Sequence, residues 1–211
     1  MVDDLAQLAL KHDSDKNFQH TGYVQYYEKY FSPLRDKPVR LLELGMYCGN
    51  SIRMWEEYFP TGHILGVDIM LYNECKYDFK RARFCIGYLQ DAVFVQEMAT
   101  NNAPFDIIID DAGHFPDQQR LCLYTLFPHL DPKGIYVIED LHTSYMEKFC
   151  GGYNREDTII DEIKKLVNHM HHNYLANNLK LRVPKLGTNE IFDDHLEAIH
   201  VYPNICFLMK R

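Results

Sequence analysis

The sequence lacks the features of a membrane, secreted or nucleic-acid-binding protein. It has no apolar segment of about 18 residues, the length that a membrane-spanning helix needs, and it begins with Asp3 and Asp4 where a signal peptide is basic. Lys and Arg form no run, and the formal net charge is −8. We therefore expect a cytoplasmic protein with no membrane or nucleic-acid partner.

Cysteine spacing gives no sign of a metal or disulfide scaffold. The six cysteines form no CxxC pair, and Cys85 and Cys206 lie in apolar runs, where a free cysteine behaves as a small hydrophobic residue. We therefore expect neither a zinc site nor a disulfide framework from Cys48, Cys75, Cys85, Cys122, Cys150 and Cys206.

The chain has the length of one globular domain. Its 211 residues are 46% hydrophobic, which is enough to build a full core, and they contain no internal repeat or low-complexity tract. We expect a single domain in which residues 1–38 form an N-terminal helical cap and residues 39–211 form the core. A homo-oligomer is compatible with this organisation.

Two apolar runs of strand length end abruptly in carboxylates. Residues 105–110 and 135–139 read as fully buried parallel strands, because they are nearly continuous apolar runs rather than alternating ones. Ligands of open α/β sheets bind just outside the carboxyl ends of such strands. We expect five side chains to gather at the rim of one crevice: Asp110, Asp111, His114, Glu139 and Asp140.

Several carboxylates in one crevice would repel one another unless a cation were present. Oxygen ligands suit a hard cation such as Mg²⁺, or else Mn²⁺ or Ca²⁺. A simpler interpretation is that Asp110 or Asp111 caps the next helix and that Glu139 and Asp140 are a solvated strand end. Because two acidic pairs are separated by one βαβ unit and a histidine follows the first pair, we favour the cation site.

A nucleotide-binding unit precedes these strands. Residues 39–44 are a predicted strand, residues 45–51 a glycine-containing turn and residues 52–59 a helix, and glycine in such a turn lets the backbone approach a ligand closely. The spacing is not GxGxxG, which weakens a dinucleotide interpretation. The second strand, residues 63–69, contains Asp68, an acid that could hold the ribose hydroxyls of NAD or S-adenosylmethionine.

The remaining elements complete an α/β fold. We expect a Rossmann-like, seven-stranded, mostly parallel sheet that ends in a C-terminal antiparallel hairpin, the layout of a class I methyltransferase. Residues 141–153 form an aromatic loop over the crevice, and residues 176–195 are a possible second substrate loop. The other predicted strands span residues 82–87, 198–202 and 205–209, and the other helices span residues 3–11, 23–31, 91–100, 117–129 and 155–175.

Several motifs permit a more specific comparison. Residues 43–51 (Glu-Leu-Gly-Met-Tyr-Cys-Gly-Asn-Ser) resemble the first motif of class I S-adenosylmethionine-dependent methyltransferases. Within that superfamily, residues 109–114 (Ile-Asp-Asp-Ala-Gly-His), 126–145 and 199–204 look most like the Mg²⁺-dependent sugar O-methyltransferases of macrolide biosynthesis. The segments 14–16 and 53–55 also match family positions, so the resemblance covers residues 11–211.

This resemblance implies roles for individual residues. Asp111, Glu139 and Asp140 would ligate Mg²⁺, and His114 would be the general base. The S-adenosylmethionine site would contain Glu43, Gly45, Met46, Tyr47, Ser51, Asp68, Ile69, Asp91 and Asp110. The acceptor would be a sugar hydroxyl, in a deoxyhexose such as rhamnose, as a small molecule or within a glycan.

The residues themselves agree with this chemistry. A sugar hydroxyl is a poor nucleophile near neutral pH, and a cation that binds vicinal hydroxyls would orient them and favour loss of a proton. Histidine has an ordinary pKa near 6.5 and could accept that proton. A helix-capping or surface role for His114 is the alternative.

Two other functions remain open at this point. A cation-dependent catechol O-methyltransferase would use similar carboxylates, and the aromatic loop at residues 141–153 suits either acceptor. A non-enzymatic nucleotide-binding module, for example an NAD-dependent protein, is compatible with the loose glycine turn, but it would leave the second carboxylate pair without a purpose.

Overall fold

The computed structural model describes residues 4–177, 190–193 and 195–211. It contains two compact units, Met1–Tyr88 and Leu89–Arg211. The boundary lies inside the predicted core rather than after residue 38, and the single-domain organisation stays a prediction. Most of the possible second substrate loop, residues 176–195, lies outside the described residues.

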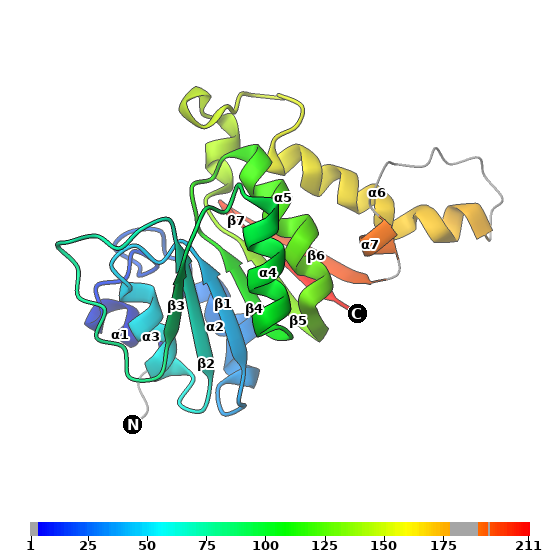
Figure 1. Ribbon diagram of the computed structural model, residues 1–211. Coiled ribbons are helices and arrows are strands. Elements are labelled where there is room, and N and C mark those ends of the chain that lie inside the picture. Colours follow the sequence, from blue (N-terminus) through cyan, green and yellow to red (C-terminus); the bar gives the residue numbers. More distant parts are fainter. Residues whose placement is uncertain (1–3, 178–189, 194) are drawn as a thin grey trace. The chain divides into compact units, whose positions relative to one another are not determined.

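The first unit contains three parallel strands in the order β3-β2-β1. Figure 1 shows α1, α2 and α3 next to these strands. Its core includes an aromatic cluster in which the rings of Tyr27 and Phe31 lie 5.2 and 5.6 Å from that of Trp55. The predicted helix at residues 23–31 is thus confirmed, and its aromatic side chains pack in this core. The elements are α1 (Leu5–Lys11), α2 (Val24–Phe31), η1 (Ser32–Leu34), β1 (Arg40–Leu44), α3 (Asn50–Tyr58), β2 (His63–Asp68) and β3 (Arg83–Ile86).

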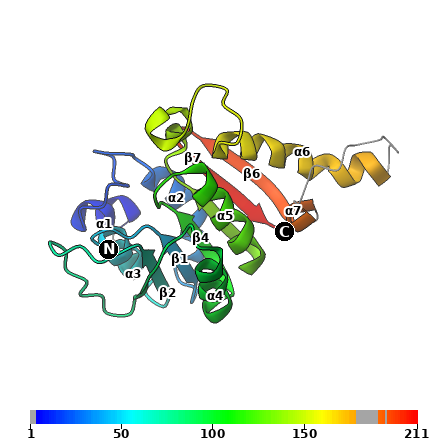
Figure 2. The same ribbon diagram turned by 45° about the horizontal axis from the view of Figure 1, so that its top comes forward.

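The second unit contains four strands in the order β4-β5-β7-β6. Strands β4 and β5 are parallel, whereas β7 runs antiparallel to both β5 and β6. Figure 2 shows β6 and β7 side by side as the orange and red arrows. The elements are α4 (Ala92–Asn102), β4 (Phe105–Asp110), α5 (Pro116–Leu126), η2 (Phe127–His129), β5 (Leu130–Ile138), η3 (Leu141–Tyr145), η4 (Glu147–Phe149), α6 (Ile159–Asn177), α7 (Glu190–Asp193), β6 (Leu196–Tyr202) and β7 (Ile205–Lys210).

The predicted Rossmann-like α/β fold is confirmed: the sheet has seven strands, is mostly parallel and ends in an antiparallel hairpin. One difference lies in β5, which begins at Leu130, whereas the strand was predicted to begin at residue 135. In the register of the parallel pair, Asp110 lies opposite Ile138. The acidic residues that follow these two positions therefore leave the sheet at the same edge.

The cysteines differ from expectation. Cys48 and Cys75 are joined in a disulfide, with Cα atoms 5.0 Å apart, although no disulfide was predicted. Their sequence separation of 27 residues matches no recognisable pattern, so only the packing of the loop after β2 against the glycine turn could reveal the pairing. Cys85, Cys122 and Cys206 are free thiols, as is Cys150.

Within the described residues, every helix is too short or too polar to span the hydrocarbon core of a bilayer.

Candidate functional site

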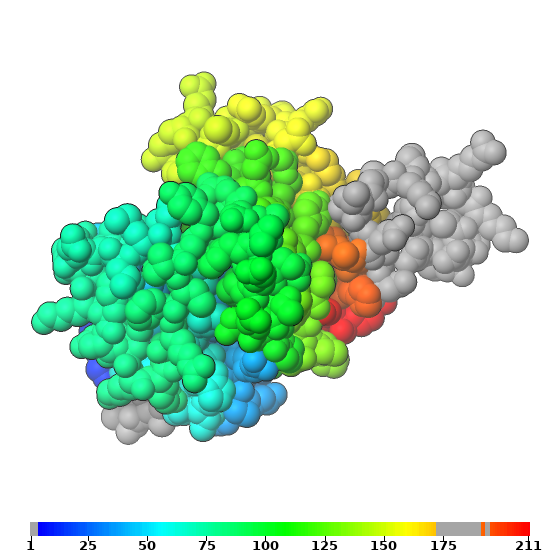
Figure 3. All heavy atoms as spheres, viewed as in Figure 1, coloured from blue at the N-terminus to red at the C-terminus, as the bar shows by residue number. Residues whose placement is uncertain are grey.

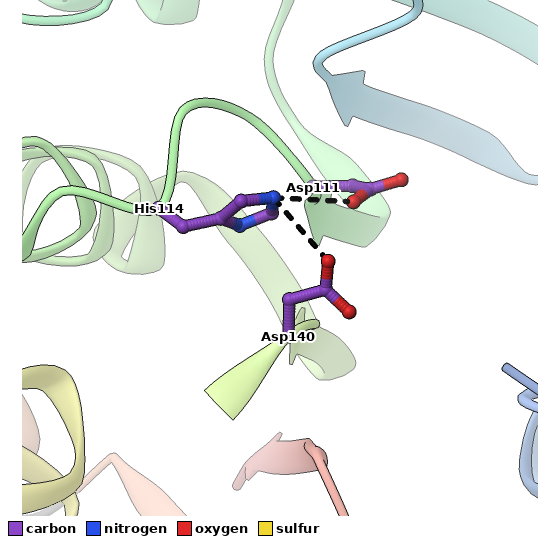
Figure 4. A group of neighbouring side chains, drawn as sticks. All are labelled: Asp111, His114 and Asp140. Atoms are coloured by element: carbon purple, nitrogen blue, oxygen red, sulfur yellow. Dashed lines mark ion pairs between the residues drawn. The ribbon is translucent and has the colours of Figure 1, made fainter. Parts of the chain in front are cut away.

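Three side chains of the second unit converge at the ends of β4 and β5, and we call Asp111, His114 and Asp140 the acidic cluster. One ligand atom from each lies within 4.8 Å of the other two. Nε2 of His114 is 3.4 Å from Oδ2 of Asp140 and 4.0 Å from Oδ1 of Asp111. Figure 4 shows both carboxylates pointing toward the same ring nitrogen. The predicted gathering at the strand ends is thus observed for these three residues.

The backbone around the cluster is unusual. His114 and Asp140 have φ angles of 58° and 53°, in the left-handed region that residues other than glycine seldom adopt. The carbonyl oxygen of Asp140 accepts hydrogen bonds from the backbone N–H and the hydroxyl of Thr143, at 2.9 and 2.7 Å. A Cβ at Gly113 would lie 2.7 Å from Oε1 of Gln118. The two turns are therefore fixed by local contacts, and strained residues of this kind often accompany function.

The donor set of the acidic cluster suits a divalent cation. Two carboxylates and an imidazole nitrogen meet at one point, and the carboxylates would repel each other without a positive charge. All three side chains are only partly exposed, which strengthens their electrostatic interaction with an ion. Carboxylate oxygens favour Mg²⁺ or Mn²⁺, and imidazole is compatible with the latter.

Glu139, the third predicted metal ligand, is placed differently. Its side chain is buried, its backbone N–H donates to the carbonyl oxygen of Asp110 at 3.0 Å, and it is absent from the group of converging ligand atoms. His114 occupies the third place in that group. A metal-ligating role for Glu139 therefore stays a prediction.

Asp110 lies at the end of β4 and is fully buried. The hydroxyl of Tyr136 donates to its Oδ2 at 3.3 Å. Burial raises the pKa of the Asp110 carboxyl to about 7, against the opposing effect of hydrogen bonds from Ala112 and Tyr136. The side chain is thus directed into protein rather than toward solvent, and its predicted contact with the cofactor stays a prediction.

An aromatic wall borders His114. The ring of Phe149, from the predicted aromatic loop, meets the imidazole edge-on at 6.0 Å and the ring of Phe115 at 5.8 Å. Figure 3 shows the atoms of this loop, in yellow-green, at the surface near the top of the view. Phe115 was not singled out from the sequence. Its position directly after His114 was the available signal.

A further histidine faces the cluster. Nδ1 of His142 lies 4.0 Å from Oδ1 of Asp140, and its side chain is about half exposed. The sequence placed His142 in a family motif but gave it no role. Two imidazoles therefore lie near the same carboxylate, each closest to a different oxygen.

In the first unit, Asp68 closes the glycine turn. Its Oδ2 accepts hydrogen bonds from the backbone N–H groups of Met46 and Tyr47, at 3.0 and 2.8 Å, and its Oδ1 accepts one from Ile69 at 2.7 Å. Asp68 is buried, and Tyr47 has a φ of 42°. The acid predicted to hold a ribose thus holds the turn through Oδ2, and its contact with a ribose stays a prediction.

Further contacts from β1, α3 and the loop after β2 hold the same turn. Ser51 donates to Oε2 of the buried Glu43 at 2.7 Å. On the other side, the hydroxyl of Tyr77 donates to the carbonyl oxygen of Tyr47 at 2.8 Å, and the ring of Tyr72 lies 4.8 Å from that of Tyr47. The predicted cofactor residues of this unit are therefore close together, and the loop after β2 supplies aromatic neighbours that the sequence did not indicate.

Gly45 and Gly49 have positive φ angles, 84° and 72°, so the turn requires glycine at both positions. Asp91, in contrast, is the N-cap of α4. It accepts hydrogen bonds from the N–H groups of Val93 and Phe94 at 2.9 and 3.3 Å. Its capping role is sufficient to explain its position, and its predicted role in cofactor binding stays a prediction.

The chain is similar to several proteins of known activity, although no family model matches it. It is 35% identical to 8-demethyl-8-alpha-L-rhamnosyl tetracenomycin-C 2'-O-methyltransferase of Streptomyces olivaceus, over 100% of this chain and 55% of that protein. It is 33% identical to mycinamicin VI 2''-O-methyltransferase of Micromonospora griseorubida, over 98% of this chain and 52% of that protein. The chain thus spans about half the length of these curated relatives.

The solved structures give the same result. The MycE methyltransferase of mycinamycin biosynthesis, in complex with Mg and SAH, superposes with a TM-score of 0.87 at 33% identity, over 100% of this chain and 55% of that one. Its complex with Mg, SAH and mycinamycin VI gives a TM-score of 0.83 at 32% identity, over 99% of this chain and 54% of that one.

Proposed function

We propose that this chain, which is similar to sugar O-methyltransferases, transfers the methyl group of S-adenosylmethionine to a hydroxyl group of a sugar, with Mg²⁺ as its metal. The observation that supports this most directly is the acidic cluster, in which two carboxylates and an imidazole meet at the carboxyl ends of two parallel strands. Together, a general base and a cation site can orient a sugar hydroxyl and favour the loss of its proton.

The glycine turn of the first unit would hold the methyl donor. Its backbone is pinned by Asp68 and by Glu43 through Ser51, so the turn is organised before a ligand binds. Tyr47 is exposed and in a left-handed conformation, which leaves its ring available to a ligand. The remaining predicted contacts are Gly45, Met46, Ile69, Asp91 and Asp110.

Asp111 and Asp140, with Glu139 as the third predicted ligand, would hold the cation. Mg²⁺ bound there would supply a positive charge that orients the acceptor and favours loss of its hydroxyl proton. Asp140 is held in position by its left-handed backbone and by Thr143, so the carboxylate is ready without rearrangement. Such preorganisation is what makes electrostatic assistance effective.

His114 would accept the proton. As the acceptor oxygen forms its bond to the methyl carbon, the carbon–sulfur bond breaks and its electron pair stays on sulfur, which leaves S-adenosylhomocysteine. The hydroxyl proton goes to His114, and the positive imidazolium is stabilised by the adjacent carboxylates of Asp111 and Asp140. The Asp111-to-His114 spacing places acid and base on one turn.

The acceptor that fits best is a deoxyhexose such as rhamnose, in a small molecule or a glycan. The tetracenomycin relative is named for a rhamnosyl acceptor. Phe149 and Phe115 present an apolar surface beside His114, and such a surface suits the C–H faces and methyl group of a 6-deoxy sugar. A catechol ring would also fit against it, so this acceptor is the second candidate.

The test is acceptor selection. The protein would be incubated with labelled S-adenosylmethionine and Mg²⁺ against a series of methyl rhamnosides and other glycosides, with catechols in parallel. Transfer to a sugar hydroxyl supports the proposal, and NMR would identify the methylated position. Transfer to catechols alone would replace the sugar assignment with the second candidate. Binding of NAD in place of S-adenosylhomocysteine, measured by calorimetry, would overturn the methyltransferase assignment.

A further inference from the structure

The polar segment between α1 and α2, residues 12–23, is a structured connection. The N–H groups of Ser14 and Asn17 donate to the carbonyl oxygens of Ala9 and Ser14, at 2.9 and 3.2 Å, and Asn17 Nδ2 donates to the Ser14 carbonyl at 2.6 Å. The N–H of Val24 donates to the Lys16 carbonyl at 3.1 Å. This polar run follows neither helix nor strand periodicity, because local hydrogen bonds fix its path instead.

The segment places a lysine in the protein interior. The side chains of Lys16 and Glu43 are both 0% exposed, and Nζ of Lys16 lies 3.5 Å from Oε1 of Glu43. Lysine and glutamate are almost never fully buried unless they are paired, since each loses its hydration. Asp15 also lies 4.0 Å from the same Nζ, but its side chain is 68% exposed. Of these two ion pairs of Lys16, water therefore screens the buried pair with Glu43 less than the pair with Asp15.

Glu43 connects this ion pair to the glycine turn. It lies in β1, before the turn, and its second oxygen accepts the hydrogen bond of Ser51 in the first turn of α3. Burial raises the pKa of Glu43, and the ammonium of Lys16 opposes that rise. The charged and polar groups that face Glu43 are Lys16 and Asp15 from the N-terminal segment and Ser51 and Trp55 from α3.

We propose that Lys16 is a positioning residue for the methyl donor: its buried ion pair with Glu43 fixes the Glu43–Ser51 link, and this link holds the glycine turn in its binding shape. The inference rests on the proposed function in naming the ligand of the turn. It assigns a purpose to the segment at residues 14–16, which the proposed chemistry otherwise leaves unused. It also makes Glu43 a support of the turn rather than a contact exposed to the ligand.

The experiment measures binding of S-adenosylhomocysteine by calorimetry, from about pH 5 to 8, for the whole chain and its variants. Lys16→Met should weaken binding by roughly tenfold or more, because it removes the ammonium that opposes the rise in the pKa of the buried Glu43, and a Glu43 that binds a proton more readily holds Ser51 less firmly. The acid limb of the binding profile should move up by about one pH unit or more. Asp15→Asn is the matched control, because it removes the exposed neighbour of the same ammonium; its profile should stay close to that of the wild type, and any small shift of the acid limb should be toward lower pH.

A folded Lys16→Met variant with wild-type affinity and an unmoved acid limb would overturn the inference. If Lys16→Met does not fold, the double variant Lys16→Met/Glu43→Gln decides, because it removes both buried charges together. It should fold and bind with no acid limb over the same pH range. A double variant that retains the acid limb would show that another group controls binding, and would also overturn the inference.

Failure of the proposed function gives a different result. If the wild type does not bind S-adenosylhomocysteine, the cofactor assignment fails, and amide hydrogen exchange of residues 45–51 then tests the ion pair alone. Exchange there should be faster in Lys16→Met than in the wild type and unchanged in Asp15→Asn. Equal exchange in all three proteins would remove the link between Lys16 and the turn.

Discussion

Nε2 of His114 lies 3.4 Å from Oδ2 of Asp140, and both residues have left-handed backbone conformations. One follows β4 and the other follows β5, so the contact is made by the parallel register of the two strands. A protein that holds two strained residues against each other compensates the strain elsewhere, and such arrangements cluster at functional sites. This pair is the centre of the proposed mechanism.

Replacing the base should abolish turnover without loss of the methyl donor. His114→Ala is expected to lower kcat by roughly 100- to 10,000-fold, the usual contribution of a general base, while the affinity for S-adenosylhomocysteine stays unchanged. Steady-state kinetics and calorimetry check the two parts. His171→Gln, on the exposed part of α6, is the control and should retain full activity. Comparable kcat values for His114→Ala and the wild type would exclude His114 as the base.

The affinity for Mn²⁺ of three single variants tests which of the predicted ligands bind the ion. Asp111→Asn and Asp140→Asn are each expected to weaken Mn²⁺ binding, followed by electron paramagnetic resonance, by about tenfold or more, because each removes a negative charge from the converging group. Glu139→Gln should weaken it to a similar degree if Glu139 ligates the ion. Unchanged affinity in Glu139→Gln would show that Asp111 and Asp140 hold the ion without Glu139.

Replacing Asp68 should mainly weaken binding of the cofactor product, whereas replacing Asp91 should mainly lower the stability of the fold. Asp68→Ala removes the acceptor of three backbone N–H groups and should weaken S-adenosylhomocysteine binding by roughly tenfold to a hundredfold. Asp91→Ala removes a helix N-cap and should lower the free energy of unfolding by about 1 kcal/mol. Calorimetry on both variants checks the comparison. A large loss of affinity in Asp91→Ala would establish the contact with the cofactor that the sequence predicted.

The buried carboxyl of Asp110 should make stability depend on pH. Because burial raises its pKa from 3.8 to about 7, the folded state binds a proton that the unfolded state releases. The resulting stabilisation is present in acid and is lost as the pH rises through about 7. In metal-free protein, Asp110→Asn should therefore be more stable than the wild type at about pH 8, by an amount on the order of 2–4 kcal/mol.

Denaturant unfolding at about pH 5 and pH 8, in the presence of a chelator, measures this effect. Asp106→Asn, a half-buried position on the same strand, is the control and should show the pH dependence of the wild type. If Asp110→Asn also keeps the wild-type pH dependence, Asp110 does not change its protonation on unfolding.

The aromatic wall should affect the acceptor more than the methyl donor. Phe149→Leu shortens the apolar surface beside His114 and is expected to raise the KM for a 6-deoxy sugar by roughly fivefold to tenfold, with a smaller change in kcat. Steady-state kinetics with each substrate varied in turn checks this. Phe18→Leu, at an exposed phenylalanine of the first unit, is the control. An equal rise in the KM for S-adenosylmethionine would argue against an acceptor-specific role.

The sequence predicted those parts of the site that depend on local patterns. Apolar runs that end in Asp110 and Glu139 identify buried parallel strands, and the parallel register then brings the residues after them together. The glycine turn and Asp68 follow from the same logic. Each of these inferences needs only the periodicity of a strand and the position of its carboxyl end.

The remaining parts depend on contacts between distant segments. Nothing in the spacing of Cys48 and Cys75 predicts their disulfide, and nothing in the polar run around Lys16 predicts that this lysine is buried beneath Glu43. The absence of Glu139 from the converging group also could not be foreseen, because adjacent residues after a strand point in different directions. Tertiary packing determines these features, and single-sequence patterns do not encode it.

The most direct test of metal-dependent sugar methylation is turnover of S-adenosylmethionine with a methyl rhamnoside, with Mg²⁺ and after its removal by EDTA. The account predicts turnover that disappears with EDTA, returns when Mg²⁺ is added, and is largely lost in Asp111→Asn under all conditions. Full turnover by Asp111→Asn in the presence of EDTA would contradict it, because methylation would then proceed without the cation site.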